Sequence, residues 1–97
     1  MALPIVFRQI ARQEMDESIA WYEKERSGLG IEFAAEIEIV LNRIASTPEQ
    51  FQQIRGEMRR AVLRRFPYTI HFLIESHRIV ILAVFHAKRS PKRLEDR

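Results

Sequence analysis

The sequence predicts an α+β domain in which a helical hairpin covers one face of a small, mainly antiparallel β-sheet. Residues 79–85 read IVILAVF, and a run that is apolar at every position is typical of a strand buried on both faces. Two segments with helical periodicity come before the last three strand-like runs, and a glycine-containing break separates them. With one short strand at the start, the predicted order is β-α-α-β-β-β.

The N-terminal half accounts for the first strand and both helices. Residues 3–7, LPIVF, are apolar, and their proline suits an edge strand or the start of a strand. A first amphipathic helix is predicted over residues 11–26. The glycines at positions 28 and 30 then favour a tight turn with a left-handed cap. A second amphipathic helix follows this turn and ends at Thr47 and Pro48.

The C-terminal half is predicted to form a three-stranded meander after a connecting loop at residues 49–57. Pro67 separates the strand predicted at residues 58–65 from the strand at residues 68–75, and a short turn leads into the last strand. The first and third strands of a meander run in the same direction, so we expect the residues at and just after their C-terminal ends to lie at one end of the sheet. These residues are Arg64, Arg65, His86 and Arg89.

With helices on one side only, the other face of this sheet is expected to be open. Side chains alternate along a strand, so either the even-numbered or the odd-numbered residues of the run 79–85 would occupy it. Either choice gives a concave apolar floor or a surface that a partner covers. We therefore expect self-association into a homodimer, or assembly with another chain into a hetero-oligomer.

The 97 residues are enough for a single domain, which we predict to span residues 1–97. The sequence contains no cysteine, which excludes disulfides, iron–sulfur clusters and thiolate chemistry. No apolar run approaches the roughly 20 residues that span a bilayer, and the N-terminus does not resemble a signal peptide. We expect a cytoplasmic protein with no membrane partner.

Charge is distributed unevenly along the chain. Residues 1–50 contain five Lys or Arg and nine Asp or Glu, whereas residues 51–97 contain eleven and four. The net charges of the two parts are therefore −4 and +7, and the basic half is where an anionic partner is expected to dock. The alternative is a solvated basic rim that pairs with the acidic helices. The basic side chains concerned are Arg55, Arg59, Arg60, Arg64, Arg65, Lys88, Arg89, Lys92 and Arg93.

His86 is the best candidate for a general acid or base, because it follows a buried strand and its ordinary pKa lies near neutrality. The alternative interpretation is a polar histidine at a strand end. Tyr68 could stack on a base or donate a proton, although its alternation with apolar residues favours core packing. Trp21 is interpreted as a flank or interface contact. No metal or cofactor is expected, because the other histidines lack carboxylate neighbours at ligand spacing and no glycine-rich phosphate loop is present.

Several segments together resemble the RelE/ParE superfamily of toxins from bacterial type II toxin–antitoxin, or plasmid stabilisation, modules. The segments are MDESIAWYE and EFAAEIE in the helices, the GLG break, the TPEQF loop, and RRAVLRRFPYTIHFLIE and VILAVFHAKRSP in the strands. The resemblance covers nearly the whole chain. It implies a β-α-α-β-β-β toxin and a cognate antitoxin whose C-terminal segment wraps the toxin surface.

Within this superfamily, RelE-like toxins cleave mRNA on the ribosome and ParE-like toxins inhibit DNA gyrase. The RRFPYTIHF segment is more similar to the ParE-like pattern, and the tail after Arg89 lacks the Tyr or His typical of ribosome-dependent members. We therefore predict a ParE-like toxin that arrests growth by binding, with DNA gyrase as its target. Antitoxin or target binding is assigned to Arg55, Arg60, Arg64, Arg65, Tyr68, Lys88 and Arg89.

Two alternatives to a gyrase-binding toxin stay open. The first is a RelE-like endoribonuclease that acts on mRNA at the ribosome. Its catalytic residues would be His86, Arg89, Arg64 and Arg65, with arginines stabilising the charge that develops on phosphorus. The second is a non-toxic relative that serves as a binding module.

Overall fold

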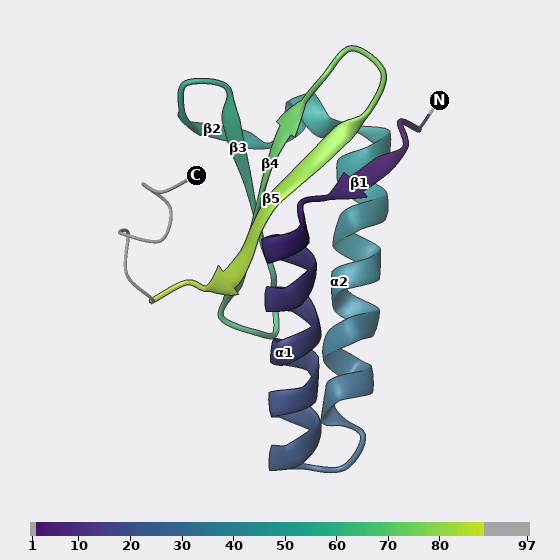
Figure 1. The fold of residues 1–97 in the computed structure, drawn as a ribbon, viewed down its shortest axis with the longest axis vertical. Helices are drawn as coiled ribbons and strands as arrows, with labels where there is room; N and C mark the ends of the chain where they lie inside the picture. Colours follow the sequence, from purple (N-terminus) through teal and green to yellow (C-terminus); the bar gives the residue numbers. More distant parts are fainter. Residues whose placement is uncertain (1, 89–97) are drawn as a thin grey trace.

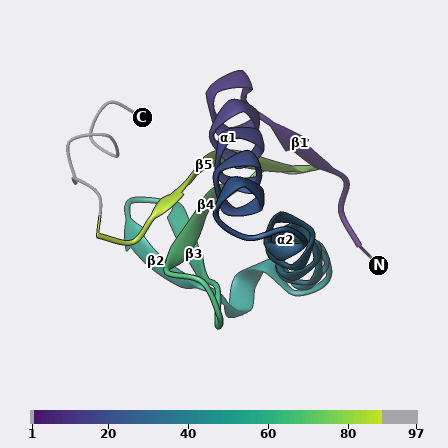
Figure 2. The same cartoon turned by 90° about the horizontal axis from the view of Figure 1, so that it is seen from below.

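The computed structural model describes residues 2–88, which form two helices and a five-stranded sheet (Figure 1). The elements in chain order are β1 (Ile5–Phe7), α1 (Gln9–Glu25), α2 (Leu29–Ser46), the 3₁₀ turn η1 (Pro48–Gln50), β2 (Gln52–Arg55), β3 (Met58–Val62), β4 (Tyr68–Ile74) and β5 (Ile79–His86). The order across the sheet is β1-β5-β4-β3-β2, with β1 parallel to β5 and the other neighbours antiparallel. Both helices lie on the same side of the sheet (Figure 2), so the predicted α+β class is confirmed. Within residues 2–88, neither helix is long and apolar enough to cross a membrane.

The sheet has one strand more than the sequence predicts, because β2 lies inside the segment 49–57 that is expected to be a loop. β2 pairs with β3, with Gln52 opposite Arg60, and Gly56 takes a φ of 55° in the turn between them. Three of its side chains are exposed, and Ile54 is half-buried. β2 is therefore an edge strand defined by its backbone pairing, and its polar sequence lacks the alternation that would reveal a strand.

β5 changes the face that it presents to the helices partway along its length. The register with β4 shifts so that Leu82 is the extra residue of a β-bulge. Ile81 faces the helices before the bulge, whereas Val84 does so after it, and His86 then lies opposite Tyr68. Neither strict alternation predicted for this strand is correct. Because every residue of the run is apolar, the sequence does not reveal the switch.

The face of the sheet opposite the helices is buried rather than open. Val80 and Leu82 are 6% and 2% exposed, and they form a second apolar cluster with Met58. On the same face, the ring of the buried His71 stacks on that of Phe85, with 5.0 Å between their centroids. The expectation of an exposed apolar floor is therefore wrong. The reason to expect self-association through that face disappears with it.

The two helices form a hairpin that its connecting turn holds in place. Gly28 has a φ of 87°, a left-handed conformation that favours glycine, so the predicted turn is confirmed there. The Glu23 carboxylate accepts hydrogen bonds from the backbone N–H groups of Gly28 (2.9 Å) and Gly30 (3.0 Å), and its negative charge suits the start of α2. A Cβ on Gly30 would lie 2.6 Å from the backbone oxygen of Ile19. The helices therefore approach closely at this glycine.

An aromatic cluster joins the helical hairpin to the sheet. Tyr22 of α1 and Phe33 of α2 lie 4.8 Å apart between ring centroids, and both contact the rings of Phe66 and Tyr68. Phe33 is fully buried and Tyr68 is 3% exposed. Several of these contacts are edge-on, an arrangement that adds to the stabilisation from buried area. The cluster therefore fixes the position of Tyr68, which also forms part of a groove described below.

Candidate binding grooves

Two grooves flank the end of the sheet where β3 and β5 finish. The register places Val62 opposite Thr69 and His86 opposite Tyr68, so residues 63–67 and the end of β5 lie at the same end, as predicted. One groove lies between α1 and β5, and the other lies between α2 and the end of β3. Among the described residues, 2–88, the two grooves share no lining residue.

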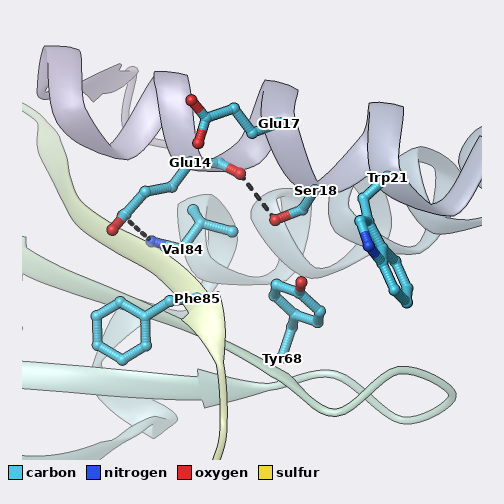
Figure 3. A pocket seen from close by; sticks show the side chains of 7 residues that line it. All are labelled: Glu14, Glu17, Ser18, Trp21, Tyr68, Val84 and Phe85. Atoms are coloured by element: carbon cyan, nitrogen blue, oxygen red, sulfur yellow. Dashed lines mark hydrogen bonds between the residues drawn. The ribbon is translucent and has the colours of Figure 1, made fainter. Parts of the chain in front are cut away.

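The α1–β5 groove exists because β1 is too short to cover the whole edge of β5. β1 pairs with residues 79–81, so the backbone of Val84 extends beyond the pairing. The Glu14 carboxylate of α1 accepts a hydrogen bond from the Val84 N–H at 3.0 Å, and the Ser18 hydroxyl donates to the Glu14 carbonyl at 2.8 Å (Figure 3). The first bond fixes α1 beside β5 and satisfies a strand N–H that would otherwise lack a partner in the sheet, whereas the second lies within α1.

This groove consists of two adjoining hollows, of about 220 and 410 Å³, that share Trp21 and Tyr68. Glu14 and Glu17 line the first hollow, and Lys88 lines the second. The groove is therefore negative at one end and positive at the other. Within residues 2–88, the groove is lined by Glu14, Glu17, Ser18, Trp21, Tyr22, Tyr68, Val84, Phe85, His86 and Lys88.

Two aromatic residues form the middle of the α1–β5 groove. Trp21 is 54% exposed, and its ring stands edge-on to Tyr22 at a centroid distance of 5.0 Å. Tyr68 is nearly buried, yet its hydroxyl points toward α1 between Ser18 and Trp21 (Figure 3). Tyr68 thus belongs to the core, as its alternation indicates, and also supplies a polar atom to the groove.

His86 lies at the positive end of the groove with a defined tautomer. Its Nδ1 accepts a hydrogen bond from the Lys88 backbone N–H at 3.1 Å, and its ring stands edge-on to Tyr68 at 5.4 Å. A backbone N–H can only donate, so the neutral imidazole must carry its proton on Nε2. Within residues 2–88, no carboxylate is hydrogen-bonded to this ring. His86 is therefore arranged to donate a hydrogen bond from Nε2 rather than to accept a proton there.

The α2–β3 groove, of about 420 Å³, combines apolar walls with charged edges. Ile39 of α2 and Val62 of β3 are 61% and 56% exposed, although both are large apolar residues. The Glu36 carboxylate accepts hydrogen bonds from the backbone N–H groups of Arg64 and Arg65, which attaches residues 63–67 to α2. The lining residues are Glu32, Ala35, Glu36, Ile39, Val40, Arg43, Val62, Arg64 and Arg65.

Electrostatic pairing differs between Arg64 and Arg65, two of the three arginines that line this groove. The Arg65 guanidinium lies 2.6 Å from the Glu32 carboxylate, and Arg26 approaches the same carboxylate at 3.6 Å. The hydrogen bond from Arg65 lowers the pKa of Glu32, and the positive charges of Arg26 and Arg65 act in the same direction against desolvation. Within residues 2–88, the Arg64 side chain forms no ion pair. Pairing with an acidic helix, the predicted alternative for the basic residues, therefore applies to Arg65.

The predicted site residues are distributed over separate parts of the molecule. Arg64 and Arg65 line the α2–β3 groove, whereas Tyr68, His86 and Lys88 line the α1–β5 groove. The described members of the set thus share one end of the sheet, as expected, but line two separate grooves. Carboxylates of α2 bind the segment after β3, so Arg64 and Arg65 line the α2–β3 groove.

The remaining predicted residues lie elsewhere. Arg55 and Arg60 belong to β2 and β3, where the Arg60 guanidinium donates to the Gln52 side chain at 3.3 Å. Arg89 lies outside the described residues. Consequently, the described members of the catalytic set proposed for a ribonuclease do not converge on one groove.

Sequence reasoning singles out Trp21 as an interface contact but does not single out Ile39 or the groove carboxylates. Ile39 lies off the apolar stripe of α2, and an apolar side chain on the polar face of a helix is the signal that could have found it. Glu14 carries no such signal. Its partner, Val84, lies 70 positions away and becomes a neighbour only through the fold.

Comparisons with known proteins identify similar chains. A family model described as the ParE toxin of the type II toxin–antitoxin system parDE matches residues 5–91. A structure of the chromosomal ParDE toxin–antitoxin system from P. aeruginosa superposes with a TM-score of 0.76 at 14% identity, over 90% of this chain and 98% of that chain. The toxin–antitoxin complex RelBE2 from Mycobacterium tuberculosis gives 0.60 at 20% identity, over 89% and 99%. At these identities the two structures show a shared fold. A search of curated proteins found no match.

Proposed function

Because the chain belongs to the ParE toxins of type II toxin–antitoxin systems, we propose that it arrests growth by binding DNA gyrase and that a cognate antitoxin neutralises it. The superfamily resemblance favours gyrase, since the RRFPYTIHF segment is more similar to ParE-like than to RelE-like toxins. Both similar structures are described as toxin–antitoxin systems, which supports an antitoxin as the natural partner.

The observation that carries a binding mechanism is the hydrogen bond to His86. General base catalysis needs a lone pair that faces the substrate, whereas the Nδ1 lone pair of His86 accepts the Lys88 N–H at 3.1 Å. The neutral ring therefore presents a donor at Nε2. A donor at this position suits recognition of an anionic or carbonyl group on a partner.

The separation of the basic residues supports the same conclusion. A phosphoryl-transfer site needs its acid, base and cations around one reacting group. Here His86 lies in the α1–β5 groove, while Arg64 and Arg65 lie in the α2–β3 groove. Arg65 is in addition engaged by Glu32 at 2.6 Å. The described arrangement thus favours two binding surfaces over one catalytic centre.

We assign the antitoxin to the α2–β3 groove. Ile39 and Val62 offer exposed apolar surface, and Arg43 and Arg64 provide positive charge at the edge. An amphipathic segment with apolar side chains at helical spacing and acidic residues beside them would complement this surface. Charged edges also accelerate association and select against wrong partners.

The substitution His86→Gln tests binding against catalysis. Glutamine keeps a side-chain N–H donor but cannot transfer a proton at neutral pH. We expect the variant to inhibit gyrase supercoiling nearly as well as the wild type, and we expect neither protein to cleave mRNA on translating ribosomes. Thermal unfolding of both proteins serves as the control for folding.

A ribonuclease gives the opposite result. If His86 transfers a proton, wild-type protein cleaves ribosome-bound mRNA and His86→Gln lowers the rate by about 10²- to 10⁴-fold. That outcome, together with DNA supercoiling by gyrase that the toxin does not inhibit, would replace the gyrase proposal with the RelE-like alternative.

A further inference from the structure

The α1–β5 groove has features of a ligand site that the antitoxin assignment does not use. Trp21 exposes 54% of its surface in the middle of the groove, on a helix whose position the Glu14 bond to β5 fixes. The edge-on contact with Tyr22 limits the orientations of the indole. Tryptophans held in this way are enriched among the residues that contribute most to protein interfaces, because they bury much area at low entropic cost.

The Tyr68 hydroxyl is a second, independent indication of a ligand. Only 3% of the surface of Tyr68 is exposed, and its hydroxyl faces the groove (Figure 3). Within residues 2–88, no side chain or backbone group is hydrogen-bonded to this hydroxyl. Among residues 2–88, the hydroxyl oxygen is not one of the buried polar atoms that lack a partner, so it is open to the groove and can accept or donate a hydrogen bond there. A polar group of a bound molecule would form that hydrogen bond.

The charges of the groove decide which class of molecule fits. Lys88 and the Nε2–H of His86 lie at one end, and Glu17, whose carboxylate accepts a hydrogen bond from Gln13 at 3.2 Å, lies at the other. A nucleic acid strand carries negative charge at every phosphate, so it would place phosphate near Glu17 and meet repulsion. A polypeptide can present an acidic group at one end and a basic group at the other. The groove therefore favours a polypeptide.

We infer that the α1–β5 groove binds an extended segment of the toxin's protein target, with an acidic side chain at Lys88 and His86, an apolar side chain on Trp21 and a basic side chain at Glu17. This inference rests on the proposed function, since it names the surface through which target binding arrests growth. It also separates target binding from the α2–β3 groove that we assign to the antitoxin. The two surfaces should accordingly respond to different substitutions.

The test measures both partners on the same variants. Trp21→Ala should weaken gyrase binding by about 30-fold or more, the effect of losing a dominant interface residue, and should reduce growth arrest on induction. Ile10→Ala is the matched control, because Ile10 is a large exposed residue of the same helix that does not line the groove. We expect this control to leave gyrase binding unchanged. Antitoxin affinity should remain at the wild-type value in both variants.

Charge-reversing substitutions provide a second test of the groove that does not depend on Trp21. Lys88→Glu and Glu17→Lys should each weaken target binding, and they concern exposed side chains whose replacement leaves the core intact. Retained gyrase binding and growth arrest in Trp21→Ala and in both charge variants would overturn the inference while leaving the proposed function standing. Loss of antitoxin affinity with unchanged target binding would also overturn it, since the groove would then belong to the antitoxin.

Other outcomes separate the remaining possibilities. A single-stranded oligonucleotide that binds the wild type but not Trp21→Ala would overturn the inference in favour of a nucleic acid ligand. If the wild type arrests growth without binding gyrase, gyrase is not the target. The inference about the groove is then tested by growth arrest alone: it stands if Trp21→Ala reduces growth arrest and is overturned if it does not. A wild type that arrests no growth and binds no gyrase would overturn both proposals.

Discussion

Truncation of Ile39 should weaken antitoxin binding by an amount that follows from its exposure. Complete burial of an isoleucine side chain contributes about 1.5–3 kcal/mol. Because 61% of Ile39 is exposed in the free toxin, an antitoxin that covers it would gain about 1–2 kcal/mol from this residue. Ile39→Ala is therefore expected to raise the Kd by about 5- to 30-fold. Calorimetric titration of the purified toxin with its antitoxin measures the change.

Ile31 offers a matched control on the same helix. It is 72% exposed but does not line the α2–β3 groove, so Ile31→Ala should change antitoxin affinity by less than about twofold. Both substitutions remove exposed methyl and methylene groups, so neither should change the free energy of unfolding by more than about 0.5 kcal/mol. Equal effects of the two substitutions on affinity, or no effect of Ile39→Ala, would refute the assignment of the antitoxin to this groove.

Three further predictions concern charge and packing. Arg64→Glu should weaken antitoxin association more than Arg12→Glu on α1. Arg64→Glu should also reduce the salt dependence of antitoxin binding, which titrations at several ionic strengths measure. Equal effects of the two substitutions would place the interface elsewhere. Gly30→Ala should destabilise the fold by about 1–3 kcal/mol because its Cβ would meet α1, and an unchanged Tm in calorimetry would contradict this close approach. Because the pKa of Glu32 is lowered in the folded state, its ionised carboxylate stabilises the fold. This contribution is complete at pH values above the pKa of an unfolded glutamate, about 4.3, and is lost as pH falls through the folded-state pKa. The Tm difference between wild type and Glu32→Gln should therefore disappear at low pH, and a difference that persists there would show that another interaction causes it.

The elements with strong periodicity could be predicted from the sequence. Both helices, the left-handed turn at Gly28 and the buried last strand follow from local composition, because each depends on residues close in the chain. β2 could not be predicted in the same way. Its polar residues form a strand only because β3 lies beside them, and that pairing depends on the turn at Gly56.

The candidate sites depend even more on contacts between distant residues. The bulge at Leu82 brings His86 to the helix side, and a uniformly apolar strand contains no signal for it. The charge count of the C-terminal half suggests one cationic surface. In the fold, Glu32 and Glu36 bind the segment at Arg64 and Arg65, which lines a different groove from His86. Sequence alone thus identifies several of the residues but not their grouping into two grooves.

Stoichiometry distinguishes a toxin that binds its target from one that acts by catalysis. The direct measurement titrates the toxin into a fixed concentration of gyrase, with DNA supercoiling as the readout, and in parallel into translating ribosomes with mRNA integrity as the readout. A binding mechanism predicts that inhibition of supercoiling saturates near stoichiometric toxin, that the inhibited fraction does not increase with time, and that mRNA stays intact. Progressive loss of mRNA at toxin concentrations far below that of the ribosomes, with supercoiling unaffected, would contradict it.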